Sequence, residues 1–273
     1  MKGFIIGISL IAIFVFMALF APFISPYDPT FVSENLRLPP IWSEGGVPEF
    51  ILGTDDLGRD VLSRIIHGAP VSLGIGFFVV ILSTFIGTFL GALAGSIGGV
   101  IDQILSRLMD IILALPSMLM AIVVVAILGP SLQNTVIAVA VVSIPAVFRL
   151  VRGSVMSEMN KTYVLASKSF GTSWARMIFI NVLPNCLAPI IVQASLGFSD
   201  AILNAAALGF LGLGAQPPTA EWGTMLADSR GYIESSPWMV TLPGLCILFV
   251  VIGFNLIGDG LRDYFDPQLR EMR

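Results

Sequence analysis

Charged side chains are scarce in this chain. Only 12% of its 273 residues are Asp, Glu, Lys or Arg, which is about half the share found in soluble domains. Hydrophobic residues make up 56%, and several windows are long enough to cross a hydrocarbon core of roughly 30 Å as helix. The sequence also lacks the basic stripe of a nucleic-acid-binding protein. It therefore predicts an all-α polytopic membrane protein that does not bind nucleic acid.

Residues suited to metal binding and nucleophilic chemistry are equally rare. His67 is the one histidine, and the two cysteines, Cys186 and Cys246, lie in different apolar segments. No zinc site can be assembled from this set, and we expect both cysteines to be small packing residues. The phosphate-binding motif G-x-x-x-x-G-K-[ST] is absent as well. These absences predict a non-catalytic chain without its own cofactor, so that any energy source must lie in a partner.

Six apolar segments are predicted to cross the membrane as helices. They are Phe4–Phe23, a stretch within Val71–Val100, Ile111–Gly129, Leu132–Phe148, a stretch within Cys186–Gly214, and Trp238–Gly258. The chain then divides into a first helix (1–24), an outer segment (25–70) and a five-helix core (71–273), which contains an inner loop (151–185) and a second outer segment (215–237). If the N-terminus is cytosolic, ten basic residues lie inside and four outside. This distribution follows the positive-inside rule and predicts that both termini are cytosolic.

The end of the first outer segment carries a helical pattern. Val61, Leu62, Ile65 and Ile66 share one face of a helix, and the neighbouring charged residues lie mostly off it. This pattern predicts a short amphipathic helix at the outer membrane interface, just before the second span.

Two features inside the spans suggest close packing and a polar path. Glycines recur every four residues at Gly87, Gly91, Gly95 and Gly99, which lets another helix approach closely, either within the subunit or from another subunit. In the fifth span, Asp200 is a carboxylate within an apolar segment, with Asn204 one turn away. Such a residue either faces a translocation path or makes a structural hydrogen bond, here to Asn204 or Gln193.

The segment "YVLASKSFGTSWARMIFINVLP" (Tyr163–Pro184) interrupts the apolar pattern. It resembles the signature loop of ABC importer permeases, which runs E-A-A, three residues, G, about nine residues, I-x-L-P. Leu165, Ala166 and Ser167 stand at the E-A-A positions, Gly171 at the glycine, and the segment closes with Ile180, Val182, Leu183 and Pro184. Leu165 and Ser167 depart from the pattern, so an ion pair made by the acid in relatives has no counterpart here.

Longer strings narrow the resemblance to the peptide and nickel importers. "LGTDDLGRDVLSR" (Leu52–Arg64), "DIILALPS" (Asp110–Ser117), "ALGFLGLGAQPPTAEWGTMLAD" (Ala207–Asp228) and "FNLIGDGLRDYFDP" (Phe254–Pro267) are similar to the second permease subunit of that family. "INVLPNCLAPIIVQASLGF" (Ile180–Phe198) resembles the dipeptide permease subunit in particular. The resemblance covers nearly the whole chain.

The resemblance implies a type I ABC importer permease, with a cytosolic coupling loop of two short helices broken at Gly171. The residues expected to contact a cytosolic ATPase are Leu165, Ala166, Ser167, Lys168, Phe170, Gly171, Trp174, Arg176, Met177 and Pro184. Large apolar residues would enter a groove while Lys168 and Arg176 lie around them. The alternative, a merely solvated connecting helix, explains the charges but not the large apolar residues.

The resemblance also implies an assembly in the bacterial inner membrane. It would contain a homologous permease, two ATPase subunits that bind ATP and Mg, and a periplasmic or lipid-anchored peptide-binding protein, with surrounding lipid. Asp200, Asn204 and Gln193 are the residues expected along the translocation path.

Other functions fit the sequence less well. Longer peptides or nickel are alternative substrates. An ion-coupled secondary transporter should show internal repeats and more intramembrane charges, and a membrane-embedded enzyme should show converging catalytic groups. Neither pattern occurs in the sequence, which therefore predicts a permease subunit of an ATP-driven dipeptide importer.

Overall fold

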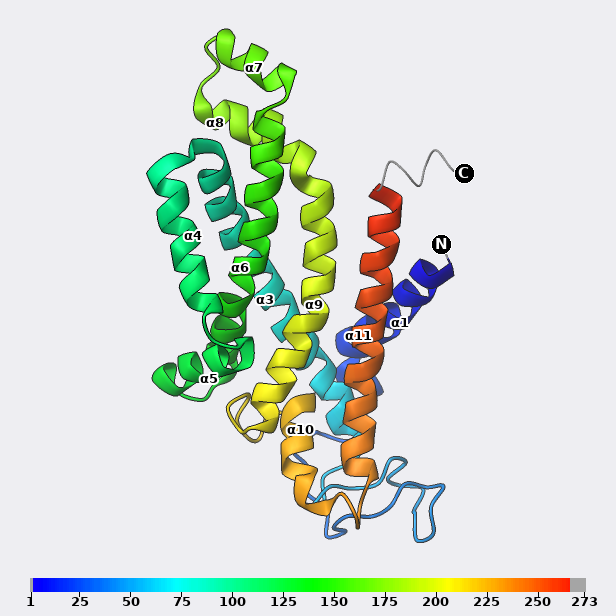
Figure 1. Ribbon diagram of the computed structural model, residues 1–273. Helices are drawn as coiled ribbons and strands as arrows, with labels where there is room; N and C mark the ends of the chain where they lie inside the picture. Colours follow the sequence, from blue (N-terminus) through cyan, green and yellow to red (C-terminus); the bar gives the residue numbers. More distant parts are fainter. Residues whose placement is uncertain (1, 266–273) are drawn as a thin grey trace.

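The computed structural model describes residues 2–265, and these form a bundle of helices without a β-strand (Figure 1). The elements are α1 (Lys2–Leu19), α2 (Ala21–Ile24), α3 (Val61–Ile97), α4 (Gly99–Leu113), α5 (Ser117–Leu128), α6 (Leu132–Met159), α7 (Thr162–Ser169), α8 (Trp174–Arg176), α9 (Leu187–Phe210), α10 (Trp222–Ser229) and α11 (Trp238–Phe265). Residues 266–273 of the predicted core lie outside the described part of the chain.

The number of apolar helices confirms the predicted membrane architecture. Five stretches are long and apolar enough to cross a membrane: α1, α3, α6, the combined segment Trp174–Phe210, and α11. The bent pair α4 and α5 completes a set of six if it is counted as one span. The chain is therefore an all-α polytopic membrane protein with six candidate spans.

The long helices place two different regions at opposite ends of the bundle (Figure 1). The hairpin of α7 and α8 lies at one end, which we call the hairpin end. The segment 25–60 and α10 lie together at the other, which we call the α10 end. α4, α5 and α6 stand on one side of the bundle and α1 and α11 on the other, with α3 and α9 between them.

The third span is bent at Pro116, where a proline within the predicted span implies a kink, but the early start of the helix and the sharpness of the bend were not predicted. We expected one helix over Ile111–Gly129, but α4 already begins at Gly99, and α4 and α5 meet at an angle of 91°. Pro116 explains the break, because proline lacks an amide hydrogen and disfavours helix at the residue before it. The predicted boundaries of this span were therefore wrong by a full helix at its start.

The predicted interfacial helix does not exist as a separate element. α3 begins at Val61, with the Asp60 carboxylate accepting the Ser63 amide as an N-cap, and continues without interruption to Ile97. Val61 and Ile65 are buried in a cluster with Trp222 and Met225 of α10. The apolar face thus packs against protein rather than lying open, because α10 folds back over the start of α3.

The glycine repeat is explained by packing within the subunit. A Cβ on Gly87 would come within 2.7 Å of the Val147 Cβ, and one on Gly91 or Gly95 would come within 2.8 Å of an α6 carbonyl. α3 and α6 make the most extensive helix pair of the bundle. Gly99 plays a different part: with Gly98 it adopts positive φ and turns the chain from α3 into α4.

Candidate coupling hairpin and transport cavity

A glycine turn forms the tip of the hairpin at the end of α7. Gly171 has a φ of +73°, and its amide donates to the Lys168 carbonyl at 3.0 Å. The Thr172 amide donates to the Ser167 carbonyl at 3.1 Å. These two bonds make a Schellman cap, whose left-handed position suits glycine. The structure thus has a break at Gly171, as the resemblance implied.

Apolar side chains project from this tip. Phe170 is 89% exposed and Leu165 is 51% exposed, although the same segment carries several polar residues. The other predicted coupling residues that are exposed are Ala166, Lys168, Gly171, Trp174, Arg176 and Pro184, while Ser167 is half-buried. Nine of the ten predicted residues are therefore exposed or half-buried.

Met177 is the exception, and its prediction as a docking anchor was wrong. It is only 3% exposed and belongs to a core cluster with Val155, Val164 and Ile178. The chain over Met177–Val182 is a π-helical stretch, which widens the turn between α8 and α9 and directs Met177 inward. Pro184 follows in a short 3-10 turn, so it modifies the helix at this point rather than ending it.

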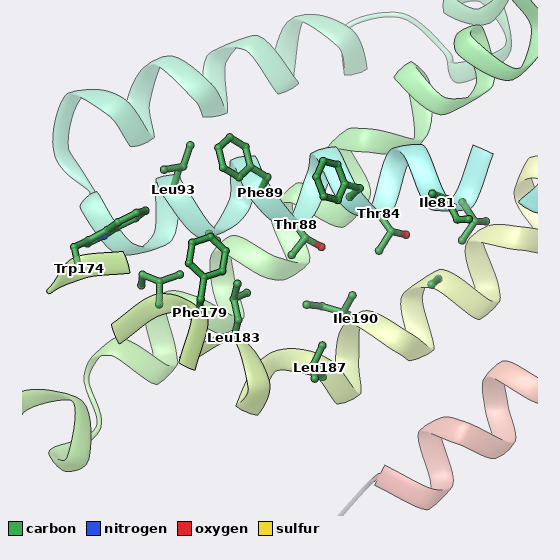
Figure 2. Close-up of a pocket in the computed structure, with 15 residues that line it drawn as sticks. Ile81, Thr84, Thr88, Phe89, Leu93, Trp174, Phe179, Leu183, Leu187 and Ile190 are labelled. Carbon is green, nitrogen blue, oxygen red and sulfur yellow. The ribbon is translucent and has the colours of Figure 1, made fainter. Parts of the chain in front are cut away.

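Trp174 ties the hairpin to α3. Its indole Nε1 donates to Ser96 Oγ at 3.2 Å, and the ring lies over the end of α3 (Figure 2). Part of its surface remains exposed. Trp174 therefore connects the hairpin to a membrane helix.

A polar bracket that the sequence analysis missed holds the base of the hairpin. The nearly buried Glu158 accepts a hydrogen bond from Tyr163 OH at 2.5 Å and pairs with Lys161 at 2.7 Å. Asn185 Nδ2 donates to the same Tyr163 oxygen at 3.0 Å, and Asn181 Nδ2 donates to Ser167 Oγ at 3.2 Å. The Glu158–Lys161 spacing was the only sequence signal. The bracket links the end of α6, α7 and the turns that lead into α9.

A polar cavity of about 300 Å³ lies between α3, α6 and α9 and contains all three predicted path residues, Gln193, Asp200 and Asn204. The Asn204 amide donates to the Asp200 backbone oxygen at 2.8 Å, not to its carboxylate. Among the described residues, no hydrogen bond or ion pair reaches the Asp200 carboxylate, so the structural bond that the sequence left open is not formed.

An apolar groove of about 510 Å³ continues from this cavity toward the hairpin (Figure 2). Val80, Thr84 and Ala194 line both spaces, which makes the two adjacent. Thr84 and Thr88 are the hydroxyl residues of the groove, and its far end is closed by Trp174. The polar cavity is thus followed by the apolar groove along α3 and α9.

At the α10 end, a group of charged residues around Arg64 is buried. Arg64 is only 2% exposed, and its Nε lies 3.5 Å from Asp55 Oδ2. Arg59 Nε is 2.6 Å from the same oxygen, and Arg59 Nη2 is 3.8 Å from Asp228 of α10. Sequence reasoning placed these arginines mostly off the packed face. The i, i+4 spacing of Asp55 and Arg59 was the signal available.

Glu221 anchors α10 to α3 from a buried position. Its carboxylate accepts the amides of Gly223 (2.8 Å) and Thr224 (2.9 Å) and the Ser72 hydroxyl (3.1 Å). Burial raises the pKa of the Glu221 carboxyl, although these bonds act in the opposite direction. The Trp222 indole Nε1 donates to the Ile65 carbonyl at 3.1 Å. No residue pattern in the sequence indicates this anchor.

Metal chemistry has no site in the part of the chain that the structure describes. Within residues 2–265, no group of three His, Cys, Asp or Glu side chains is placed to hold a metal ion. Cys186 and Cys246 are both free thiols. The described residues form a membrane bundle with a polar cavity inside. At one end, a hairpin held by hydrogen bonds at its base exposes apolar side chains at its tip. This is the layout of a transport subunit.

Comparison with protein families identifies the family to which this chain belongs. Residues 87–271 match the model of the binding-protein-dependent transport system inner membrane component, and residues 2–40 match the N-terminal TM domain of oligopeptide transport permease C. The chain belongs to this family of inner membrane permeases.

Relatives agree with the assignment, and a solved structure agrees with the fold. The chain is 57% identical to the di/tripeptide transport system permease protein DppC of Pseudomonas aeruginosa, over 98% of this chain and 89% of the relative. It is 55% identical to the dipeptide transport system permease protein DppC of Escherichia coli K12, over 99% and 90%. A structure of the MetNI methionine ABC transporter in an inward-facing conformation matches with a TM-score of 0.62 at 18% identity, over 74% and 97%, which supports the fold.

Proposed function

We propose that this chain is a permease subunit of an ATP-driven dipeptide importer. The observation that supports this substrate class is the similarity of the chain to relatives described as di/tripeptide or dipeptide permeases. The similarity extends over nearly the full length of the chain, with more than half of the aligned positions identical. The chain supplies half of a translocation path. A homologous permease supplies the other half, and an external peptide-binding protein delivers the substrate.

The hairpin is the proposed contact with the ATPases, two of which bind ATP and Mg for the complex. Its support is physical as well as familial: Phe170 and Leu165 are exposed at the tip, whereas the base is braced by Glu158 and Tyr163. An exposed apolar tip fits a groove in a partner, and a braced base can transmit the partner's movement to α6 and α9.

The substrate proposal is tested with a reconstituted complex of both permeases, the ATPases and the binding protein. L-alanyl-L-alanine is expected to stimulate ATP hydrolysis and to enter the vesicles, while a pentapeptide and Ni²⁺ are the comparison substrates. Stimulation by the pentapeptide or Ni²⁺ alone would shift the substrate class to the alternatives. Uptake that continues without the ATPases would support an ion-coupled transporter instead.

The proposed topology places the hairpin end in the cytosol and the α10 end in the periplasm. Cysteines introduced at the exposed Glu34 and Glu234 should react with an impermeant reagent in intact cells, after Cys186 and Cys246 are replaced. A cysteine at Lys168 should react only after the cells are opened. Labelling at Lys168 in intact cells would contradict this orientation. Glu221 is unsuitable as a reporter because it is buried.

A further inference from the structure

One charged side chain lacks a partner in the cavity between α3, α6 and α9. The described lining residues are uncharged apart from Asp200 and include the amides of Gln193 and Asn204. Two lining hydroxyls already use their hydrogens, because Ser83 and Ser143 each donate to a carbonyl of their own helix at 2.8 Å. The cavity thus offers a net negative charge with amide groups beside it.

Asp200 is exposed in the isolated subunit. A carboxylate in a membrane helix faces a polar partner or a water-filled space rather than lipid, because moving an unpaired charge out of water is costly. No partner for the Asp200 carboxylate occurs among the described residues of this chain. The charge that fits the cavity is therefore a cation supplied from outside the subunit.

We propose that Asp200 receives the terminal ammonium group of the peptide during its passage. This inference rests on the proposed function and assigns a role to one residue of the same path. The ammonium would donate to the carboxylate, and the amides of Asn204 and Gln193 would serve the polar backbone of the peptide.

Dimensions agree with this assignment. Gln193 and Asp200 are seven residues apart on one helix, which corresponds to about 10 Å along its axis. An extended dipeptide spans roughly 7 Å, so it can lie between the two side chains. A cavity of about 300 Å³ can hold a molecule of this size. The adjoining apolar groove, lined by Thr84 and Val80 at their junction, is placed to accept side chains as the peptide moves on.

The first test compares Asp200→Asn with Asp200→Glu in the reconstituted complex, using labelled L-alanyl-L-alanine. Loss of the charge should reduce uptake by about tenfold or more, since an unmatched ammonium in a semi-enclosed site is unfavourable. The Glu variant should retain most of the uptake. Normal uptake by Asp200→Asn would overturn the proposal.

A second test separates charge from folding. Asp200→Cys is assembled in a background without Cys186 and Cys246 and is then modified with methanethiosulfonates that attach an anionic, a neutral or a cationic group. The anionic group should restore uptake well above the other two. Because modification follows assembly, a folding defect cannot produce a difference between reagents.

Three other outcomes would overturn the role proposed for Asp200. Equal rescue by neutral and anionic groups would show that Asp200 only fills space, and rescue by the cationic group would show the opposite charge requirement. Failure of all three reagents to reach position 200, checked by mass, would show that the cavity is closed to substrates. Failure of the unmodified wild-type complex to take up the dipeptide would instead count against the proposed function.

Discussion

The two ends of this molecule both bury charged residues, but in different settings. At the hairpin end, Phe170 and Leu165 are exposed while the charged Glu158 is nearly buried in a polar bracket. At the α10 end, Arg64 and Asp55 are buried together and hold the outer segment onto α3. Exposed apolar surface on a braced support is typical of an interaction site. Buried ion pairs are typical of a structure that must keep one arrangement.

The comparison therefore assigns different tasks to the two ends. Contacts at the α10 end are internal to the chain, so substitutions there should affect stability first. Contacts at the hairpin tip are available to a partner, so substitutions there should affect assembly and coupling while leaving the fold intact. The predictions below test this division.

The largest effect is expected from Asp55→Ala. It would leave the Arg59 and Arg64 guanidinium groups, both buried, without their shared carboxylate. Removal of one partner from a buried ion pair costs about 3–5 kcal/mol, so the purified subunit should show a strongly lowered unfolding temperature or fail to accumulate. Glu34→Ala, at an exposed position of the same segment, is the control and should be close to wild type. Equal stability of the two variants would contradict the division.

Phe170→Ala should have the next largest effect, but on binding rather than folding. Its ring is exposed in the subunit, and burial of a Phe side chain in a partner contributes about 1.5–3 kcal/mol. Copurification of the ATPases should fall while the subunit's unfolding temperature stays unchanged. Phe23→Ala, an equally exposed Phe far from the hairpin, should bind the ATPases normally. A lowered unfolding temperature for Phe170→Ala would place the ring in the fold instead.

Gly171→Val should uncouple the complex by distorting the tip. No atom lies within 4 Å of a Cβ at this position, so the cost comes only from its φ of +73°. Left-handed backbone costs a residue with a side chain roughly 1–2 kcal/mol, and relaxation of that strain would move Phe170. We expect normal insertion with loss of peptide-stimulated hydrolysis. Gly171→Asn is the matched control, because Asn tolerates this conformation, and coupling by both variants would count against the role of the turn.

Lys168→Ala should have the smallest effect. Its charge lies at the edge of the tip and is exposed, and such a charge changes association rates more than affinity. ATPase copurification should stay within about threefold of wild type, with a weaker dependence on salt. A loss as large as that of Phe170→Ala would mean that the tip binds mainly through charge.

The sequence predicted what depends on local pattern and apolar length. Six apolar segments and the close approach at Gly87 follow from residue types at short spacing, whereas the break at Gly171 was implied by the resemblance to ABC importer permeases. The structure has each of them. Met177 was misassigned because its direction depends on a π-helical stretch that no residue pattern announces. The burial of Arg64 and Glu221 depends on α10 folding back across more than a hundred residues. Such long-range contacts leave no periodic signal.

The right-angle bend between α4 and α5 carries a consequence for the environment of the subunit. Leu113, Ala114, Leu115 and Pro116 lie at the bend with their surfaces open in the isolated chain. Peptide carbonyls freed by such a break cannot be left facing hydrocarbon, which offers no donor to them. Ser117, directly after the break, lines the polar cavity of Asp200. This flank of the bundle must therefore meet water or another protein, and so it is a side from which lipid is kept away.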